Sequence, residues 1–339
     1  MIGHATLTGA KVLVTGGAGF IGSHLVDRAL ADGAAEVHIV DTLVNGREEN
    51  LASALASGRA ELHVEDVCDP VAMEQRTRAA DVVFHLACLG VRHSLHDPIE
   101  NHRVNADGTL VLLQAALQAE VSMFVHVSSS EVFGTAQYAP MDEQHPTWPE
   151  TVYGAGKLAG EASARAHFRT YGMPVVVARP FNTYGTRSHF EGDSGEVIPR
   201  TIVRALCGRP ALVYGDGTQT RDFMHVSDTV AGLVALASAR AVGRTVNLGS
   251  GAEISINDLV TLIAKAVGRP DLEPQHLPDR PGDVRRLLVD ASLIRDLTGV
   301  VPVTELERGL EELVAWFGSR EEPPEEMLRR IEDRNWEPA

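Results

Sequence analysis

The first half of the chain alternates between short, continuously apolar runs and longer segments with helical spacing of apolar residues. The short runs, between residues 11 and 180, are KVLVTG, EVHIVD, ELHVED, DVVFHLAC, MFVHVSSS and PVVVARP. Runs that are apolar nearly throughout are typical of strands buried on both faces of a parallel sheet. Helices are expected between them, near residues 20–31, 98–118 and 151–171. The alternation predicts an α/β fold, a Rossmann-type doubly wound parallel sheet over residues 1–180.

The pattern changes after about residue 180, where loops rich in Gly and Asp become frequent. Helices are expected near residues 197–207, 227–239, 256–267 and 304–317. We therefore expect residues 181–320 to form mainly a smaller C-terminal α/β lobe for substrate, partly interleaved with the first domain. Residues 321–339 are highly charged and are expected to be a tail, either a surface helix or disordered.

Charge and composition narrow the possible partners. The composition is ordinary for a globular protein, with 44% hydrophobic and 22% charged residues. A formal net charge of -16 repels nucleic acid and anionic membranes, so neither is expected as a partner. No signal peptide and no run of about 18 apolar residues is found, so no membrane segment is expected. Three cysteines without CxxC spacing favour a reducing, cytoplasmic setting over a disulfide framework.

Four histidines, His85, His93, His96 and His102, lie close together in the sequence. They lack cysteine or carboxylate partners at the spacings of known metal sites. No metal centre is therefore expected from them.

A glycine-rich segment, VLVTGGAGFIG, lies between the first expected strand and the first expected helix. Gly17, Gly19 and Gly22 satisfy G-x-G-x-x-G, whereas Gly16, Gly19 and Gly22 satisfy G-x-x-G-x-x-G. Glycine at these positions allows a tight turn and close approach of the backbone to a pyrophosphate. The N-terminus of the helix then offers free N–H groups and a partial positive charge. The segment predicts a dinucleotide site.

Two aspartates end the second and third expected strands. Asp41 lies about 20 residues after the glycine segment, where a carboxylate accepts hydrogen bonds from both adenosine ribose hydroxyls. It would repel a 2′-phosphate, and no arginine directly follows it, so the sequence favours NAD over NADP. Asp66 is placed either to hydrogen-bond adenine or to cap the helix before Pro70.

The segment YGAGK places Tyr153 and Lys157 four residues apart, on one face of an expected helix. We expect the ammonium of Lys157 and the positive nicotinamide ring to lower the phenol pKa from about 10. The phenolate would then take a proton from a substrate hydroxyl. Ser129, at the carboxyl end of the preceding strand, is placed to hydrogen-bond the same oxygen, since ligands bind at this edge of such sheets.

These motifs, together with NADGT, SSSEVFG, RPFNTYG, GDGTQTRDFMHVSD, NLGSG and RPGDVRR, resemble those of an extended short-chain dehydrogenase/reductase. The resemblance is to the NAD-dependent nucleotide-sugar epimerase/dehydratase group, and it extends from about residue 11 to 318. It implies a catalytic triad of Ser129, Tyr153 and Lys157. The residues that it assigns to the dinucleotide are Gly16, Gly19, Phe20, Ile21, Gly22, Asp41, Asp66 and Val67, with Tyr153 and Lys157.

The same resemblance assigns Asn182, Arg221 and Arg280 to the nucleotide diphosphate and the nearby sugar. Two arginines on Gly-rich loops suit diphosphate recognition in their own right, because a guanidinium binds phosphate oxygens in a bidentate manner. They would also overcome the negative field of the chain locally. A homodimer is implied, paired through the helices expected at 98–118 and 151–171.

Glu131 lies at a position where the residue type distinguishes the reactions that enzymes of the group catalyse. By the resemblance, the reaction begins with oxidation at C4 of a hexose, giving a 4-keto intermediate. A 4,6-dehydratase then needs a base for the C5 proton, whereas a 4-epimerase does not. Dehydratases and UDP-glucuronate decarboxylases of the group carry a glutamate two residues after the serine, and typical epimerases carry a hydroxyl residue. The sequence therefore favours a 4,6-dehydratase with Glu131 as catalytic C5 base.

At two positions the sequence departs from the pattern of the group, so other reactions are kept as alternatives. Ser130 stands where many dTDP-glucose dehydratases carry an aspartate, the general acid for the leaving hydroxyl. Asp279 stands where the decarboxylases carry an arginine. The alternatives are a 4-epimerase of the UDP-glucose or UDP-glucuronate type and a UDP-glucuronate decarboxylase. A protein of another class, which binds NAD without catalysis, is the remaining alternative.

Overall fold

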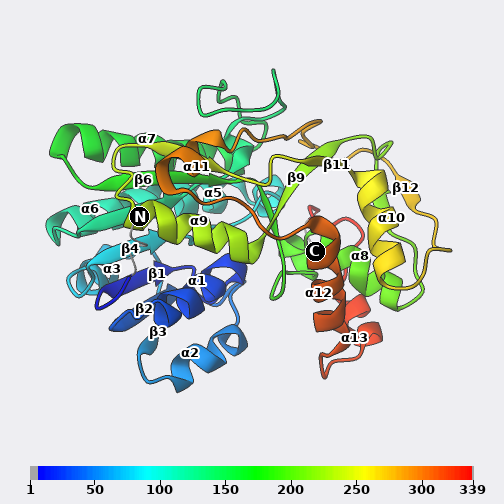
Figure 1. Ribbon diagram of the computed structural model, residues 1–339, viewed down its shortest axis with the longest axis horizontal. Helices are drawn as coiled ribbons and strands as arrows, with labels where there is room; N and C mark the ends of the chain where they lie inside the picture. The colour runs from blue at the N-terminus through cyan, green and yellow to red at the C-terminus, as the bar shows by residue number, and fades with distance from the viewer. Residues whose placement is uncertain (1–6, 338–339) are drawn as a thin grey trace.

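The central sheet contains seven parallel strands in the order β10-β6-β5-β4-β1-β2-β3 (Figure 1). The structure is a computed structural model and describes residues 7–337. The strands of this sheet are β1 (Lys11–Thr15), β2 (Glu36–Asp41), β3 (Ala60–Val64), β4 (Val82–His85), β5 (Met123–Val127), β6 (Val175–Pro180) and β10 (Thr245–Leu248). The predicted Rossmann-type fold is confirmed.

Both faces of the sheet are covered by helices, as the continuously apolar strands require. One face carries α1 (Phe20–Ala31), α2 (Ala52–Ala56), α9 (Val226–Ser238) and α11 (Ser292–Thr298). The other carries α3 (Pro70–Thr77), α6 (Gly108–Gln118) and α7 (Val152–Tyr171). Successive residues of β1 point to opposite sides, so that Val14 packs in the first core and Leu13 in the second.

The helices expected from the apolar spacing are present with small shifts at their ends. Helix α7 begins one residue after Thr151, whose Oγ1 accepts a hydrogen bond from the N–H of Gly154 at 3.2 Å and caps the helix. The helix expected at 98–118 is divided into α5 (Pro98–His102), a π-helical turn (Arg103–Asp107) and α6. It is preceded by the short helix α4 (His93–His96).

The second lobe lies at the right of Figure 1 and has its own core. Its strands are β7 (Asn182–Tyr184), β8 (Leu212–Tyr214), β9 (Thr220–His225), β11 (Glu253–Ser255) and β12 (Gln275–Leu277). Its helices are α8 (Val197–Leu206), α10 (Ile256–Ala266), α12 (Leu306–Gly318) and α13 (Pro324–Arg329). The core is built from apolar faces of these helices, with Ile202, Ile263 and Phe317 all buried.

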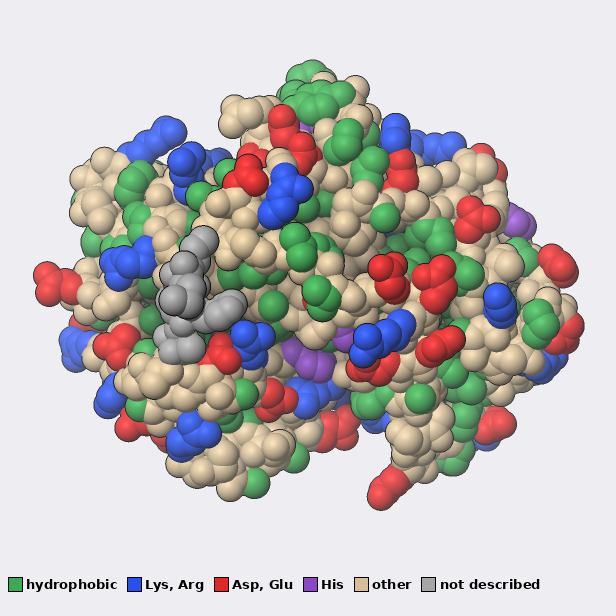
Figure 2. Space-filling model, viewed as in Figure 1, with side chains coloured by type: hydrophobic (Ala, Val, Ile, Leu, Met, Phe, Trp, Pro, Cys, Tyr) green, Lys and Arg blue, Asp and Glu red, His purple; other side chains and the backbone are tan. Residues whose placement is uncertain are grey.

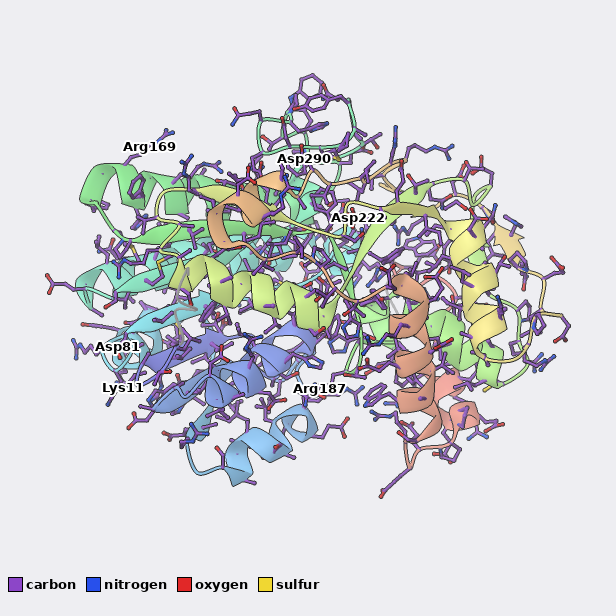
Figure 3. The ribbon with its side chains drawn as sticks, in the orientation of Figure 1. Lys11, Asp81, Arg169, Arg187, Asp222 and Asp290 are labelled. Atoms are coloured by element: carbon purple, nitrogen blue, oxygen red, sulfur yellow. The ribbon has the colours of Figure 1, made fainter. Side chains whose placement is uncertain are left out.

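Each lobe is built from more than one segment of the chain. Strand β10 lies between segments of the second lobe in sequence, after β9 and before β11, yet it is an outer strand of the central sheet and pairs with β6. An ion pair between Arg187 and Asp27, with 2.7 Å between Nη2 and Oδ2, also joins the second lobe to α1; Arg187 is labelled in Figure 3. The two lobes are therefore in contact, and the cavity described below extends from one into the other.

The charged segment after residue 320 is packed against the second lobe over its described part. Met327 is fully buried, and Trp336 lies edge-on to Tyr214 with ring centroids 4.7 Å apart. The guanidinium of Arg200 donates to the side-chain oxygen of Asn335 at 3.2 Å. The described part of this segment is therefore not disordered: it contains the helix α13, one of the two expected alternatives, and Met327 of that helix packs into the core of the second lobe.

The surface carries acidic and basic side chains interspersed over the face shown in Figure 2. Hydrophobic side chains gather there at the top, over the loop between β5 and α7. Tyr138 and Trp148 of this loop are 45% and 70% exposed. Within residues 7–337, no helix is both long enough and apolar enough to cross a membrane.

Candidate active site

A single continuous cavity of about 700 Å³ lies along the carboxyl ends of the central strands and extends into the second lobe. All the residues predicted from the sequence to bind the cofactor, to act in catalysis or to bind substrate line it. Its position is the one expected for ligands of an open parallel sheet, outside the carboxyl ends of the strands. The cavity therefore brings together residues separated by up to 267 positions, Gly16 and Asp283 being the outermost pair.

The glycine loop after β1 is packed too closely for any side chain. Gly16 has a φ of +70°, and a Cβ there would lie 2.6 Å from the backbone nitrogen of Ala87. A Cβ on Gly22 would collide with the carbonyl of Gly16, because α1 lies directly against the loop. Helix α1 starts after Gly19 with no side-chain cap among the described residues. Its first N–H groups are thus left for an anion such as the pyrophosphate of NAD.

Asp41 is held in place by the loops on either side of it. Its Oδ2 accepts a hydrogen bond from the N–H of Ala18 and its Oδ1 from the N–H of Leu43, both at 2.9 Å. Burial raises the pKa of this carboxyl. Arg47, the nearest arginine along the chain, forms ion pairs with Glu49 and Glu191 instead of facing Asp41. The geometry fits the adenosine ribose of NAD and offers no partner for a 2′-phosphate.

Asp66 lies at the end of β3 on the cavity wall. Its Oδ1 accepts from the N–H of Cys68 at 2.9 Å, and its Oδ2 accepts from Arg103 at 3.0 Å. Burial raises the pKa of Asp66, but these two hydrogen bonds lower it on balance. The cap of the following helix is Asp69, whose Oδ1 accepts from the N–H of Val71 at 2.9 Å. The reading of Asp66 as a helix cap is therefore wrong, and its place on the cavity wall agrees with the adenine reading.

Ser129, Tyr153 and Lys157 all line the cavity. Ser129 lies two residues after the end of β5, and its Oγ accepts the N–H of Glu131 at 3.2 Å. Tyr153 and Lys157 lie one turn apart on α7, and Lys157 is buried. The Nζ of Lys157 donates to the carbonyl of Val127 at 2.6 Å, which fixes the lysine against the end of β5.

The pKa of Tyr153 does not follow the expectation from the sequence. Burial raises it above its ordinary value, while a hydrogen bond with Ser129 and the positive charge of Arg92 lower it in part. Lys157 is not among the groups that lower it, because its ammonium is directed at a backbone carbonyl. Burial lowers the pKa of Lys157 as well. In the protein alone the phenol is therefore kept protonated.

Glu131 faces the cavity from the turn that follows Ser129. Its carboxylate accepts no hydrogen bond from any residue in 7–337. Burial raises the pKa of Glu131, and the charges of Arg221 and Arg280 lower it in part. A partly desolvated carboxylate without a partner is suited to accept a proton.

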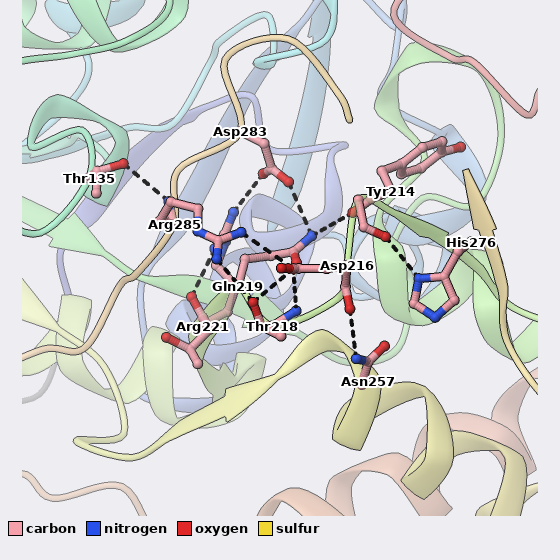
Figure 4. A network of polar contacts seen from close by, with 12 residues as sticks. Thr135, Tyr214, Asp216, Thr218, Gln219, Arg221, Asn257, His276, Asp283 and Arg285 are labelled. Carbon is pink, nitrogen blue, oxygen red and sulfur yellow. Dashed lines mark hydrogen bonds and ion pairs between the residues drawn. The ribbon is translucent and has the colours of Figure 1, made fainter. Parts of the chain in front are cut away.

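Arg221 and Arg280 converge on a shared carboxylate. Both guanidinium groups donate to Oδ1 of Asp283, at 2.7 Å and 2.6 Å (Arg221 and Asp283 are labelled in Figure 4). Arg221 also donates to the carbonyl of Thr220 at 2.8 Å. Asn182, on β7, donates to the carbonyl of Asp222 at 3.3 Å. The two arginines keep further N–H groups for an anionic ligand, and Asp283 fixes their separation.

Arg92 and Glu196 are among the charged cavity residues that the sequence analysis missed. Arg92 donates to the carbonyls of Asp193 and Ser194, at 2.6 Å and 3.0 Å, and burial lowers its pKa to about 10. Glu196 lies on the cavity wall nearby, and burial raises its pKa to about 7, against the effect of Arg92. The only sequence signal for Arg92 was its position in the loop after β4, next to the carboxyl edge of the sheet.

The four clustered histidines do not form a metal site in the described part of the chain. His85 is fully buried, with Nδ1 2.7 Å from Oγ1 of Thr15 and Nε2 2.9 Å from Oγ1 of Thr109. His96 lies 3.1 Å from a carboxylate oxygen of Asp193. His85 and His96 are thus engaged by different partners, and the four rings do not converge on one point.

Comparison with known proteins agrees with this site. The family described as GDP-mannose 4,6 dehydratase matches residues 13–313. A UDP-glucose 4-epimerase of Mycolicibacterium smegmatis is 38% identical over 91% of this chain and 99% of its own, and a dTDP-glucose 4,6-dehydratase of Actinoplanes sp. is 37% identical over 91% and 97%. The dTDP-glucose 4,6-dehydratase DesIV of Streptomyces venezuelae, crystallised with NAD, superposes with a TM-score of 0.87 at 31% identity, covering 91% of this chain and 97% of its own.

The fold and the site define an NAD-dependent enzyme that acts on nucleotide sugars, and not a protein that binds NAD without catalysis. More closely, the chain belongs to the GDP-mannose 4,6-dehydratase-like family of extended short-chain dehydrogenases/reductases. Epimerases and dehydratases match it almost equally well. The overall likeness therefore leaves the reaction to be decided by individual residues.

Proposed function

We propose that the protein is a 4,6-dehydratase of a nucleotide-diphosphate hexose, with Glu131 as the base that removes the C5 proton. The observation that carries the proposal is the carboxylate of Glu131, which faces the cavity two residues after Ser129 and is unpartnered among the described residues. NAD, when bound, accepts a hydride from C4 of the sugar and returns one at C6. The protein must then remove one proton from the C4 hydroxyl and one from C5, protonate the C6 hydroxyl as it leaves as water, and return a proton to C5.

We assign each of the two protons to be removed to a residue that lines the cavity. Tyr153 and Ser129 both line the cavity, and we assign them to the C4 hydroxyl. Glu131 adjoins them, so that it suits the neighbouring C5 carbon. Arg221 and Arg280 adjoin Glu131 and suit the diphosphate, and Asn182 lies on the same wall. The adenosine end of NAD is assigned to Asp41 and Asp66.

A 4-epimerase is the second candidate, and one observation favours it. Ser130 is 4% exposed on the cavity wall, and a serine hydroxyl is a much weaker acid than the carboxyl of an aspartate. A dehydratase without a stronger acid would have to protonate the leaving C6 hydroxyl by another route. UDP-glucuronate decarboxylation is the weakest candidate, because Asp279 replaces the arginine expected for it.

The test is proton NMR of the purified protein with NAD in D2O, using UDP-glucose, UDP-N-acetylglucosamine, UDP-glucuronate and dTDP-glucose. Deuterium at C5 together with a new C6 methyl signal is the expected outcome. A product inverted at C4 with its C5 hydrogen retained contradicts the dehydratase proposal and supports the epimerase.

The role of Glu131 is tested by Glu131→Gln with Glu150→Gln as the matched control. Glu150 is also near Glu131, but its Oε1 accepts the N–H of Thr135 at 3.0 Å and has no place in the proposed chemistry. We expect Glu131→Gln to lower kcat by about 10²- to 10⁴-fold, the usual contribution of a general base. Equal activity of the two variants would remove Glu131 from the mechanism.

We also propose a homodimer formed through α5, α6 and α7, supported by apolar side chains exposed on them. Ile99 is 84% exposed, Leu110 47% and Tyr171 60%. Leu110→Arg should convert a dimer into a monomer in light-scattering measurements, whereas Val303→Arg, at a position 74% exposed in the second lobe, should not. A monomeric wild-type protein contradicts this proposal.

The cytoplasmic location predicted from the cysteines is retained as part of the proposal. Cys68, Cys88 and Cys207 are free thiols, and Cys88 is exposed on the cavity wall. Free thiols beside a catalytic site suit a reducing compartment.

A further inference from the structure

A second group of chemically active side chains lies on the outer part of the sheet, outside the cavity. Strand β2 contributes Glu36 and His38, and β3 contributes Glu61 and His63. His38 is directly paired with Glu61 in the parallel register of these strands. Because side chains alternate along a strand, all four residues point to the same face of the sheet. None of the four lines the cavity.

Three donor atoms of this group are close enough to share one ion. Nδ1 of His38 and Nε2 of His63 are 3.3 Å apart. Oε2 of Glu61 lies 3.9 Å from the former and 3.8 Å from the latter. Two nitrogen ligands of a tetrahedral zinc ion, each about 2.0–2.1 Å from the metal, are themselves separated by about 3.3 Å. The Glu61 side chain is 68% exposed and free to close the remaining gap by a small rotation.

The second nitrogen of His38 lies near a carboxylate. Nε2 of His38 is buried and has no hydrogen-bond partner within the described part of the chain, and Oε2 of Glu36 lies 3.5 Å from it. A small rotation of Glu36 would let it accept from the N–H at Nε2, which leaves the lone pair of Nδ1 for a metal ion. Metal-binding histidines are oriented in this way by an outer carboxylate.

The arginine beside the site is paired with another residue. Arg76 is already occupied, because it forms a bidentate ion pair with Glu65, at 2.6 Å and 3.0 Å. The neutral imidazole is the form that binds metals, and the exposed carboxylate of Glu61 supplies negative charge.

We propose that His38, His63 and Glu61 bind one divalent transition-metal ion of the zinc class. Two imidazoles and one carboxylate are a donor set suited to zinc and its neighbours rather than to magnesium or calcium. The ion joins β2 to β3, which is an outermost strand of the sheet and, within residues 7–337, pairs with β2 alone. The metal is therefore structural, since no cavity reaches it, and the proposal does not depend on the reaction catalysed.

The test measures zinc bound per chain after dialysis of the full-length protein, without a histidine tag, against Zn²⁺. The variants are His38→Gln and His63→Gln, with His276→Gln as the control. His276 is an exposed histidine of the second lobe that bonds the carbonyl of Gly215 at 2.8 Å (Figure 4). Wild type and His276→Gln should bind one zinc each, and the other two variants should bind it at least tenfold more weakly.

Two further measurements test the same metal site by other means. Glu61→Gln changes an exposed side chain, so it tests the site even if His63→Gln does not fold. Co²⁺ in place of Zn²⁺ should give the visible absorption of a tetrahedral site in the wild type and not in His38→Gln. Absence of bound zinc in the wild type, or equal zinc binding in wild type, His38→Gln and Glu61→Gln, overturns the proposal.

Discussion

Arg179 and Glu161 form a buried bidentate ion pair, with Nε and Nη2 of the arginine 2.8 Å and 2.7 Å from the two carboxylate oxygens. Glu161 also accepts from Oγ of Ser128 at 2.7 Å and from Arg165 at 2.7 Å. Ser128 adjoins Ser129, and Glu161 lies one turn after Lys157 on α7. The pair therefore holds β5, β6 and α7 in the arrangement on which the catalytic residues depend.

Glu161→Ala should destabilise the fold strongly, because it leaves Arg179 buried without its partner. The expected loss at pH 7 is about 3–5 kcal/mol in urea unfolding. Glu74→Ala, which breaks a surface ion pair with Arg78, is the control and should cost less than about 1 kcal/mol. Equal losses in the two variants would contradict the role given to the buried pair.

The stabilisation from Glu161 should be lost in acid. Burial raises the pKa of Glu161, but hydrogen bonds from Arg179, Ser128 and Arg165 lower it on balance, below its ordinary 4.5. A carboxyl with a lowered folded-state pKa stabilises the fold above the unfolded pKa and loses that effect as the pH falls through the folded one. The difference in unfolding free energy between wild type and Glu161→Ala should accordingly shrink below pH 4.5.

Tyr153→Phe should lower kcat by about 10²- to 10⁴-fold while NAD still binds, because only the proton-accepting oxygen is removed. Tyr138→Phe is a matched control, since that hydroxyl bonds Asp142 on an exposed loop. Turnover measured with the active nucleotide sugar checks kcat, and NAD binding is followed separately by calorimetry. A large loss of NAD affinity in Tyr153→Phe would show that the hydroxyl serves mainly to bind the cofactor.

Arg221→Ala and Arg280→Ala should raise KM more than they lower kcat, because both guanidinium groups are assigned to the diphosphate. Each should cost about 1.5–3 kcal/mol, or roughly 10- to 100-fold in kcat/KM. Since both donate to the same oxygen of Asp283, the double variant should be non-additive. Arg286→Ala, which breaks a surface ion pair with Glu253, should leave KM unchanged. Strict additivity would contradict the shared anchor.

Glu196→Gln should make the protein more stable in mild alkali. The folded-state pKa of about 7 lies above the ordinary 4.5, so the folded protein binds the proton more tightly and stability falls as the pH rises between these values. At pH 8 the variant should gain on the order of 1–2 kcal/mol, after allowance for water in the cavity. Below pH 4.5 this gain should vanish. Thermal unfolding at both pH values, with Glu326→Gln as control, measures it.

The parts of the structure that could be predicted from the sequence are those in which a local physical constraint decides the residue type. Strands buried on both faces must be apolar throughout, and the glycines of 16–22 must lack side chains, so the sheet and the cofactor loop were predictable. Helix α1 begins and ends where its apolar spacing indicated. The carboxyl edge of the sheet also placed Ser129 and Tyr153 in one cavity.

What escaped prediction depends on contacts between distant segments. Arg92 lies on the cavity wall because its guanidinium donates hydrogen bonds to backbone carbonyls about 100 positions away in the sequence. The closeness of His38 and His63 follows from the register of β2 and β3, which no local pattern specifies. The packing of the segment containing Met327 was not predicted because its charged residues outnumber the few apolar ones that pack.

The return of β10 to the sheet limits how the protein can be divided or recombined. The edge of β6 is completed by backbone hydrogen bonds such as those from Val177 to Arg244, at 2.9 Å, and from Phe181 to Leu248, at 2.7 Å. A fragment that ends at residue 180 would leave this edge open and prone to aggregate. A chimera that exchanges substrate lobes between relatives must therefore keep β10 with the first half, so the natural unit of exchange is two separate inserts and not one contiguous C-terminal half.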